Sequence, residues 1–133
     1  MTGMLSGKRG LVMGVANERS IAWGIAKACA EAGAELAFTY QGEAFGQRLA
    51  PLAASVGSDF MVDVDVTDDA SLDAAFAQLG ARWDSLDFLV HAIAFSDKNE
   101  LTGRFMNTSR ANFKNSLDIS CYSLIEVTRR AHP

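Results

Sequence analysis

The sequence has little of what marks secreted, fibrous, membrane or nucleic-acid-binding proteins. Its 133 residues include only two cysteines and two prolines, so neither a disulfide framework nor a proline-rich linker is indicated. No apolar run approaches the roughly 18 residues that a membrane span needs. The start also lacks the apolar stretch of a secretory signal. Acidic residues number 16 against 12 basic ones, and the net charge of −4 argues against a nucleic-acid or anionic-membrane partner. We therefore expect a cytoplasmic protein.

The composition that remains is that of a folded domain. Hydrophobic residues make up 49% of the chain and charged residues 21%, which is typical of globular proteins. A chain of this length forms one domain, here expected over residues 1–133, and buries roughly two-thirds of its unfolded surface. Cys29 and Cys121 lie among apolar residues, and we expect both to be reduced core residues. Neither belongs to a CxxC motif or neighbours a histidine, so no metal site is predicted.

Segments of strand length alternate with segments of helical pattern along the whole chain. The expected strands are residues 9–15, 35–40, 59–66 and 86–94. The expected helices run over about 20–32, 43–56, 67–83 and 108–131, with Thr67 as the N-cap of the third and Pro51 as a possible break in the second. The fourth strand is almost entirely apolar, which predicts burial on both faces. This alternation predicts an α/β fold, a doubly wound parallel sheet with right-handed crossovers and strand order 3-2-1-4.

The loop after the first strand is the strongest candidate for a binding site. Ligands of such sheets bind at the carboxyl ends of the strands, beside strand one. Gly14 ends that strand and permits a tight turn, while Ser20 begins the first helix. The amides and positive dipole end of this helix suit a pyrophosphate, and the Ser20 hydroxyl either bonds the phosphate or caps the helix. Gly24 is expected to let the helix pack closely on the sheet. The spacing differs from the usual G-x-G-x-x-G, so glycines alone are weak evidence.

The end of the second strand predicts which dinucleotide binds. An acid at this place bonds the 2′-hydroxyl of the adenosine ribose, and a base accommodates a 2′-phosphate. Here Gln41 can bond a hydroxyl or the adenine, nothing basic stands next to it, and Glu43 would repel a phosphate if it points inward. We therefore predict NADH rather than NADPH.

The third and fourth strands also end on candidate residues. Asp65 and the Val66 amide are placed to bracket the adenine, although Asp65 could equally cap the turn before Thr67. The small residues at 92–94 would let the backbone approach a ribose closely. His91 lies on an apolar strand, and we interpret it as a packed core residue without a catalytic role.

Several of these segments together resemble one known family. They are Leu5–Gly14 (LSGKRGLVMG), Ser20–Ala26 (SIAWGIA), Gly33–Gln41 (GAELAFTYQ), His91–Phe95 (HAIAF) and Asp118–Ser123 (DISCYS). The combination resembles the divergent short-chain dehydrogenase/reductases, and within them the bacterial NADH-dependent enoyl-acyl-carrier-protein reductases of type II fatty acid synthesis. The resemblance covers essentially the whole chain.

The resemblance implies a set of site residues and partners. NAD would be held by Gly14, Ser20, Ile21, Gln41, Asp65, Val66 and Ile93. Ser96 falls where the family contacts its acyl substrate, at a position that is commonly alanine, and Ala94 stands where many members have glycine. The implied partners are an enoyl substrate bound to acyl carrier protein and, in the full-length form, the other subunits of a homotetramer.

The resemblance also shows what this chain lacks. The family's catalytic Tyr-x6-Lys pair lies on the fifth strand and helix, beyond the end of this sequence. Tyr122 and Arg129 have similar spacing, but both fall on the last helix, and arginine differs from lysine in hydrogen-bonding shape. We therefore expect a Rossmann-type sheet truncated after the fourth strand and fourth helix, the N-terminal portion of a reductase about twice as long. Such a chain alone would be inactive, with an exposed apolar sheet edge.

Three other functions are compatible with the strand pattern. A ketoacyl or other carbonyl reductase of the same superfamily usually carries T-G-x3-G-x-G and N-N-A-G motifs, which differ from the residues here. A non-catalytic dinucleotide-binding module would share the same cofactor loop. A receiver domain would want an acidic cluster at the end of the first strand, where this chain has Gly14-Val-Ala-Asn.

Overall fold

Four parallel strands form the central sheet, in the order β3-β2-β1-β4. The computed structural model describes residues 3–132. The strands are β1 (Arg9–Met13), β2 (Glu35–Tyr40), β3 (Met61–Asp63) and β4 (Phe88–His91). Each is shorter than or equal to its predicted range, because the flanking residues leave the ladder to enter loops. The predicted order and parallel pairing are confirmed.

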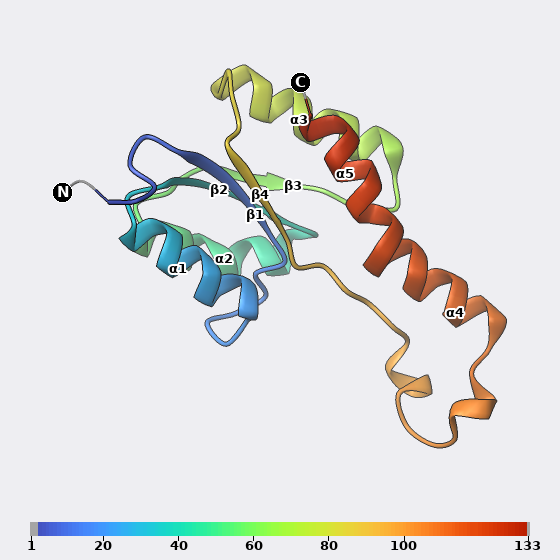
Figure 1. The fold of residues 1–133 in the computed structure, drawn as a ribbon. Coiled ribbons are helices and arrows are strands. Elements are labelled where there is room, and N and C mark those ends of the chain that lie inside the picture. The colour runs from blue at the N-terminus through green and yellow to red at the C-terminus, as the bar shows by residue number, and fades with distance from the viewer. Residues whose placement is uncertain (1–2, 133) are drawn as a thin grey trace.

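Helices cover both faces of the sheet (Figure 1). Helices α1 and α2 lie on one face, while α3 and α5 lie on the other. The α-helices are α1 (Ile21–Glu31), α2 (Glu43–Ser55), α3 (Asp69–Arg82), α4 (Arg110–Leu117) and α5 (Ser123–Ala131). Short 3-10 turns at Lys98–Glu100 and Phe105–Asn107 interrupt the predicted loop between β4 and α4. No helix within residues 3–132 is long and apolar enough to cross a bilayer.

Alternate side chains of β1 enter two separate cores. Leu11 and Met13 pack with the α3 and α5 side of the sheet, whereas Val12 packs with the α1 and α2 side. All three are at most 1% exposed, as expected where a strand has neighbours on both edges and helices on both faces. The central position of β1 therefore fixes the end of that strand, and the loop after it, firmly in place.

Two details of the helices differ from the sequence predictions. The N-cap of α3 is Asp68 rather than Thr67, because the Asp68 carboxylate accepts hydrogen bonds from the amides of Ala70 and Ser71. Pro51 lies inside α2 without ending it. Proline has no amide hydrogen, so the carbonyl of Gln47, four residues earlier, has no helical hydrogen-bond donor. Both residues are exposed, so water can bond this carbonyl instead.

Strand β4 and Cys121 are more exposed than predicted. All residues of β4 are half-buried, because within residues 3–132 only β1 pairs with this strand. Cys121 is exposed on the last helix and is not a core residue. Cys29 is half-buried, and burial raises the pKa of its thiol. Both cysteines are free thiols, as predicted.

The predicted last helix is present but contains a π-helical segment. Residues Asp118–Tyr122 form this segment between α4 and α5. The apolar side chains Phe113 and Leu117 point outward, 57% and 48% exposed, while Ser123 is buried. The buried face of the helix therefore combines the polar Ser123 and Glu126 with the apolar Val127, whereas several of its large apolar side chains face solvent.

An ionic cluster fastens α5 to α3. The Glu126 carboxylate accepts hydrogen bonds from Tyr122 Oη (2.7 Å), Arg129 Nη1 (2.5 Å) and Arg130 Nη1 (2.7 Å). Arg130 also donates to Asp73 of α3 at 2.8 Å. These donors, Tyr122 first, lower the pKa of Glu126 to about 2. Tyr122 and Arg129 therefore both bond Glu126 on the last helix, where the sequence analysis placed them.

Candidate functional site

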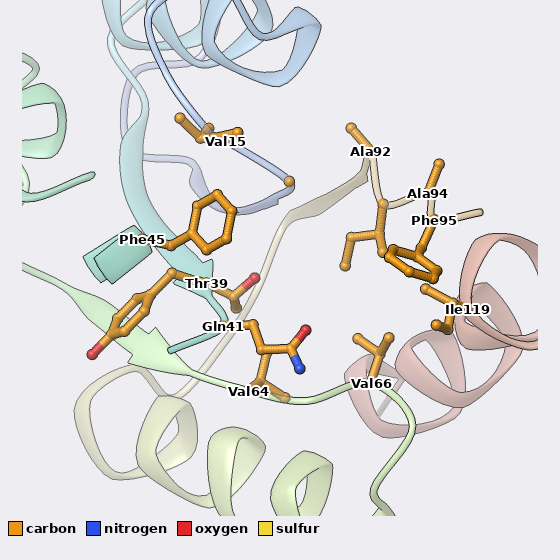
Figure 2. A pocket seen from close by; sticks show the side chains of 14 residues that line it. Val15, Thr39, Gln41, Phe45, Val64, Val66, Ala92, Ala94, Phe95 and Ile119 are labelled. Carbon is orange, nitrogen blue, oxygen red and sulfur yellow. The ribbon is translucent and has the colours of Figure 1, made fainter. Parts of the chain in front are cut away.

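A cavity of about 280 Å³ opens at the carboxyl ends of the strands (Figure 2). It lies where the strand order reverses between β1 and β4, which is the usual ligand position in a doubly wound sheet. Its lining residues are Gly14, Val15, Ala16, Thr39, Tyr40, Gln41, Phe45, Val64, Val66, Ala92, Ile93, Ala94, Phe95 and Ile119. None of these carries a charge at neutral pH, and the cavity is largely apolar with polar groups at its rim.

The structure brings half of the predicted site residues together in this cavity. Gly14, Gln41, Val66 and Ile93 line it. Ser20, Ile21, Asp65 and Ser96 lie in the adjoining loops and helix starts rather than in the lining itself. Four different strand ends therefore supply the wall, and the remaining predicted residues surround it.

Gly14 is the tightest point of the cavity wall. Its φ of +108° lies in the region that side chains rarely adopt. A Cβ at this position would stand 2.1 Å from the Ala92 carbonyl oxygen, which belongs to the segment leaving β4. The prediction of a tight turn at Gly14 is confirmed. The missing side chain lets two backbone segments meet and form one edge of the cavity.

Ser20 organises the loop that precedes α1. It occupies the N-cap position but makes no side-chain cap bond. Instead its Oγ accepts from the amides of Ala16 (2.9 Å) and Asn17 (3.1 Å). Because both lone pairs of this oxygen are used, its hydrogen remains as a donor. Gly24, by contrast, is exposed with nothing within 4 Å of a Cβ placed there, so the predicted close packing at Gly24 is wrong.

The first turn of α1 presents free donors beside Ser20. In the part of the chain that the structure describes, the amides of Ile21 and Ala22 make no hydrogen bond, whereas those of Trp23 and Gly24 bond to the Ser20 carbonyl. Unbonded amides at a helix N-terminus bind anions well. The Ile21 side chain is 82% exposed at this place, which leaves it available to cover a bound molecule.

The turn after β2 is held by an aspartate that sequence analysis did not single out. Asp63, at the end of β3, accepts a hydrogen bond from the Gly42 amide at 3.1 Å. Gly42 has a φ of +86°, so the chain reverses here directly after Gln41. Glu43 is exposed, and its carboxylate accepts from Gln47 at 3.4 Å. Gln41 is thereby fixed at the rim with its amide exposed toward the cavity (Figure 2).

Asp65 takes part in the turn that follows β3. Its Oδ1 accepts from both the amide (2.9 Å) and the hydroxyl (2.7 Å) of Thr67, which is the capping alternative stated above. The next residue, Val66, turns its side chain into the cavity (Figure 2). The other carboxylate oxygen of Asp65 could still contact an adenine, and that contact stays a prediction.

His91, predicted to be a core residue, is half-buried and packs against the last helix. Its Nε2 lies 2.7 Å from Ser123 Oγ, and burial lowers the pKa of the imidazole. The Ser123 hydroxyl also bonds the Ile119 carbonyl at 2.5 Å. The Ser123 amide donates to Asp118, five residues earlier, as the π segment requires. His91 therefore supports the turn of helix that carries Ile119 into the cavity.

Sequence analysis did not assign several residues that line the cavity. These are Val15, Ala16, Thr39, Tyr40, Phe45, Val64, Phe95 and Ile119. Thr39 carried a usable signal, since it is a polar residue within a buried strand. Phe45 and Ile119 carried none, because they reach the cavity from helices whose tilt is set by tertiary packing. No cluster of three or more His, Cys, Asp or Glu suited to a metal occurs within residues 3–132.

These features fit a dinucleotide. The cleft at Gly14, which a Cβ would fill, admits a close backbone approach, and the free amides of α1 with the Ser20 hydroxyl supply donors for a pyrophosphate. The uncharged walls suit the faces of aromatic rings. Fold and cavity together define the class: a nucleotide-binding domain of the Rossmann type.

Comparisons with known proteins identify the family. Residues 14–133 match the family model described as enoyl-(acyl carrier protein) reductase, and the chain belongs to this family. It is 59% identical over 131 residues to the enoyl-[acyl-carrier-protein] reductase [NADH] 2 of Rhizobium meliloti, covering 98% of this chain and 49% of the relative.

Solved structures of enoyl-acyl-carrier-protein reductases agree with this family assignment. The crystal structure of FabI from Candidatus Liberibacter asiaticus superposes with a TM-score of 0.96 at 58% identity, over 98% of this chain and 51% of that one. The enoyl-acyl-carrier-protein reductase of Anaplasma phagocytophilum, solved in complex with NAD, has a TM-score of 0.93 at 50% identity, over 98% and 50%. The chain thus spans about half the length of the relatives it matches.

Proposed function

We propose that this chain is the cofactor-binding, N-terminal half of an NADH-dependent enoyl-acyl-carrier-protein reductase of fatty acid synthesis. The observation that carries the proposal is the Gly14 cleft beside the free amides of α1. The family match and the NAD-bound relative support it. The full-length protein would reduce the trans-2 double bond of an enoyl thioester in the cytoplasm, as a homotetramer.

Each predicted residue has a defined task in this proposal. The Ser20 hydroxyl and the Ile21 amide bind the pyrophosphate, Gln41 bonds the adenosine ribose or adenine, and Asp65 with Val66 borders the adenine. Gly14 and Ile93 border the nicotinamide half, and Ser96 faces the acyl group. When bound, the reduced nicotinamide supplies a hydride. This chain binds and orients it and excludes water from the apolar cavity.

The experiment compares residues 1–133 with the protein that continues to about twice this length. The longer protein is expected to oxidise NADH when given a trans-2-enoyl thioester and not when given a 3-ketoacyl thioester. Residues 1–133 alone are expected to give no turnover, because the family's Tyr-x6-Lys pair is not among them. Turnover with the ketoacyl thioester would support the carbonyl-reductase alternative instead, and absence of both reactions would favour a binding module.

The preference for NADH is tested by comparing affinities for NADH and NADPH. Gln41 and the exposed Glu43 favour NADH. One cation does lie at this rim, since the Arg48 guanidinium stacks 5.6 Å from the centre of the Phe45 ring. Equal or tighter binding of NADPH would overturn the preference. An Arg48→Ala variant would then show whether this arginine binds the 2′-phosphate.

A further inference from the structure

The segment that leaves β4 pairs with helix side chains rather than with another strand. The Phe95 amide donates to Ser120 Oγ at 3.0 Å, and the Asp97 amide donates to Asn112 Oδ1 at 3.0 Å. Ser120 Oγ also lies 3.2 Å from the Phe95 carbonyl. Two alternate backbone amides of an extended segment are thus bonded by polar side chains of α4 and the π segment.

Ser96, between these two residues, is held by the same helix. Its Oγ receives hydrogen bonds from Asn112 Nδ2 and from Ser116 Oγ, both at 3.0 Å. The Asp97 amide fixes the orientation of the Asn112 side chain, because Oδ1 must face that donor and Nδ2 then faces Ser96. With two donors directed at the Ser96 oxygen, its own hydrogen is left to donate elsewhere.

The three helix residues lie on one face and follow the i, i+4 rule. Asn112, Ser116 and Ser120 are half-buried, while Asn115 on the same turns is exposed. This face also carries Ile119, which lines the cavity together with Phe95 (Figure 2). The segment and the helix therefore form one wall of the cavity.

We propose that Asn112 and Ser116 are positioning residues for the acyl substrate. They hold residues 95–97 in a fixed place against the last helix, so that the part of the cavity wall that includes Phe95 is already ordered where the acyl group would lie. The proposed dinucleotide-binding residues come from the ends of all four strands and the start of α1, and within the described residues none of them takes part in these bonds. Loss of the Asn112 or Ser116 side chain should therefore weaken binding of the acyl thioester and leave binding of NADH unchanged. This inference rests on the proposed function.

The kinetic test uses the full-length protein and a matched pair of asparagines. Asn112→Ala removes the three hydrogen bonds of this side chain, with the Asp97 amide, Ser96 Oγ and Ser116 Oγ. It is expected to raise the KM for a trans-2-enoyl thioester about tenfold, with the KM for NADH within about twofold. Asn115→Ala makes the same chemical change on an exposed turn and is expected to match the wild type. Ser116→Ala should give a smaller effect that Ser116→Thr restores. An Asn112→Ala protein that behaves like Asn115→Ala, or one in which both KM values rise together, overturns the proposal.

A second measurement follows the bonds themselves and needs no turnover. Hydrogen exchange of the Asp97 amide should accelerate at least tenfold in Asn112→Ala, and that of the Phe95 amide in Ser120→Ala, with Asn115→Ala unchanged. Unchanged exchange in Asn112→Ala overturns the proposal whatever the kinetics. A wild-type protein that reduces no enoyl thioester overturns the proposed function and with it the substrate role, while exchange alone still reports the hydrogen bonds.

Discussion

At the scale of single residues, the cavity depends on the absence of a side chain at Gly14 and on the hydrogen bonds that the Ser20 hydroxyl accepts. Gly14 contributes by having no Cβ, and Ser20 by having both lone pairs occupied so that only its hydrogen is free. Neither property is visible as a charge or a motif in the sequence. The two residues act together, because the tight turn at Gly14 leads the chain into the loop that Ser20 ties to the start of α1.

Gly14→Ala is expected to lower stability and abolish NADH binding. The new Cβ would stand 2.1 Å from the Ala92 carbonyl oxygen at a φ of +108°, so backbone must move on both sides of the cavity. Gly24→Ala is the matched control, since Gly24 is exposed within α1 and its Cβ meets nothing within 4 Å. This control should gain about 0.5–1 kcal/mol from helix propensity.

Thermal melts and NADH fluorescence titrations of the two variants check this prediction. A Gly14→Ala protein that melts at the wild-type temperature and binds NADH normally would contradict it. A loss of stability in Gly24→Ala would show instead that α1 tolerates no added methyl group.

At the scale of elements, prediction from the sequence was accurate where periodicity reflects burial and failed where it does not. Helix positions and the Gly14 turn followed from local patterns, and the strand order followed from the fold class that these patterns predict. The extent of the last helix followed as well, but its orientation did not: Leu117 is half exposed, whereas the polar Ser123 and Glu126 are buried beside Val127. Helical spacing identifies a stripe but not which way the stripe points. Contacts such as that between Asn112 and Ser96 join residues 16 positions apart, and no pattern in a single sequence indicates that they meet.

The same reasoning explains which part of the site could be predicted. Gly14 and Gln41 were found because strand ends are recognisable and parallel strands bring their ends together. Phe45 and Ile119 were missed because they reach the cavity through helix tilt and the π segment. The burial of β4 was overestimated since an apolar strand does not reveal how many neighbours it has.

The attachment of α5 is expected to weaken in acid. Hydrogen bonds from Tyr122, Arg130 and Arg129 lower the pKa of Glu126 from the ordinary 4.5 to about 2. A carboxylate whose pKa falls on folding contributes stability above its unfolded pKa, and this is lost as pH falls through the folded one. Glu126→Gln should therefore be less stable than the wild type at neutral pH, and the difference should shrink between about pH 4.5 and pH 2.

Urea unfolding at a series of pH values measures this difference. Glu31→Gln, an exposed position at the end of α1, is the control and should follow the wild type throughout. A Glu126→Gln deficit that is the same at every pH would contradict the assignment to charge.

At the scale of the whole molecule, two surfaces with apolar side chains have no cover within the described residues. Strand β4 has a partner on one edge alone within the described residues, and the apolar face of the last helix includes Phe113, Leu124 and Ile125, each about half exposed. Surfaces of this kind are typical of interfaces or of positions that further chain covers. They support the proposal that residues 1–133 are part of a longer, oligomeric protein.

Residues 1–133 expressed alone are therefore expected to self-associate. Light scattering during size-exclusion chromatography should show species larger than a monomer, and replacing Leu124 and Ile125 by lysine should reduce them. The longer protein should elute as one defined oligomer. A monomeric 1–133 product with a single cooperative melt would count strongly against the proposal.

The position of β4 beside β1 also sets the order in which the site can form. The Arg9 amide bonds the Asp87 carboxylate across 78 residues of chain, and Gly14 meets Ala92 at the far end of the same strand pair. Closing so long a loop is entropically costly and favours late assembly. During synthesis, the first three strands can pair while the cavity still lacks a wall. Affinity for the cofactor should therefore arise abruptly, once the ribosome has released β4 and the segment that follows it, and NADH should then act as a ligand that locks β4 in place.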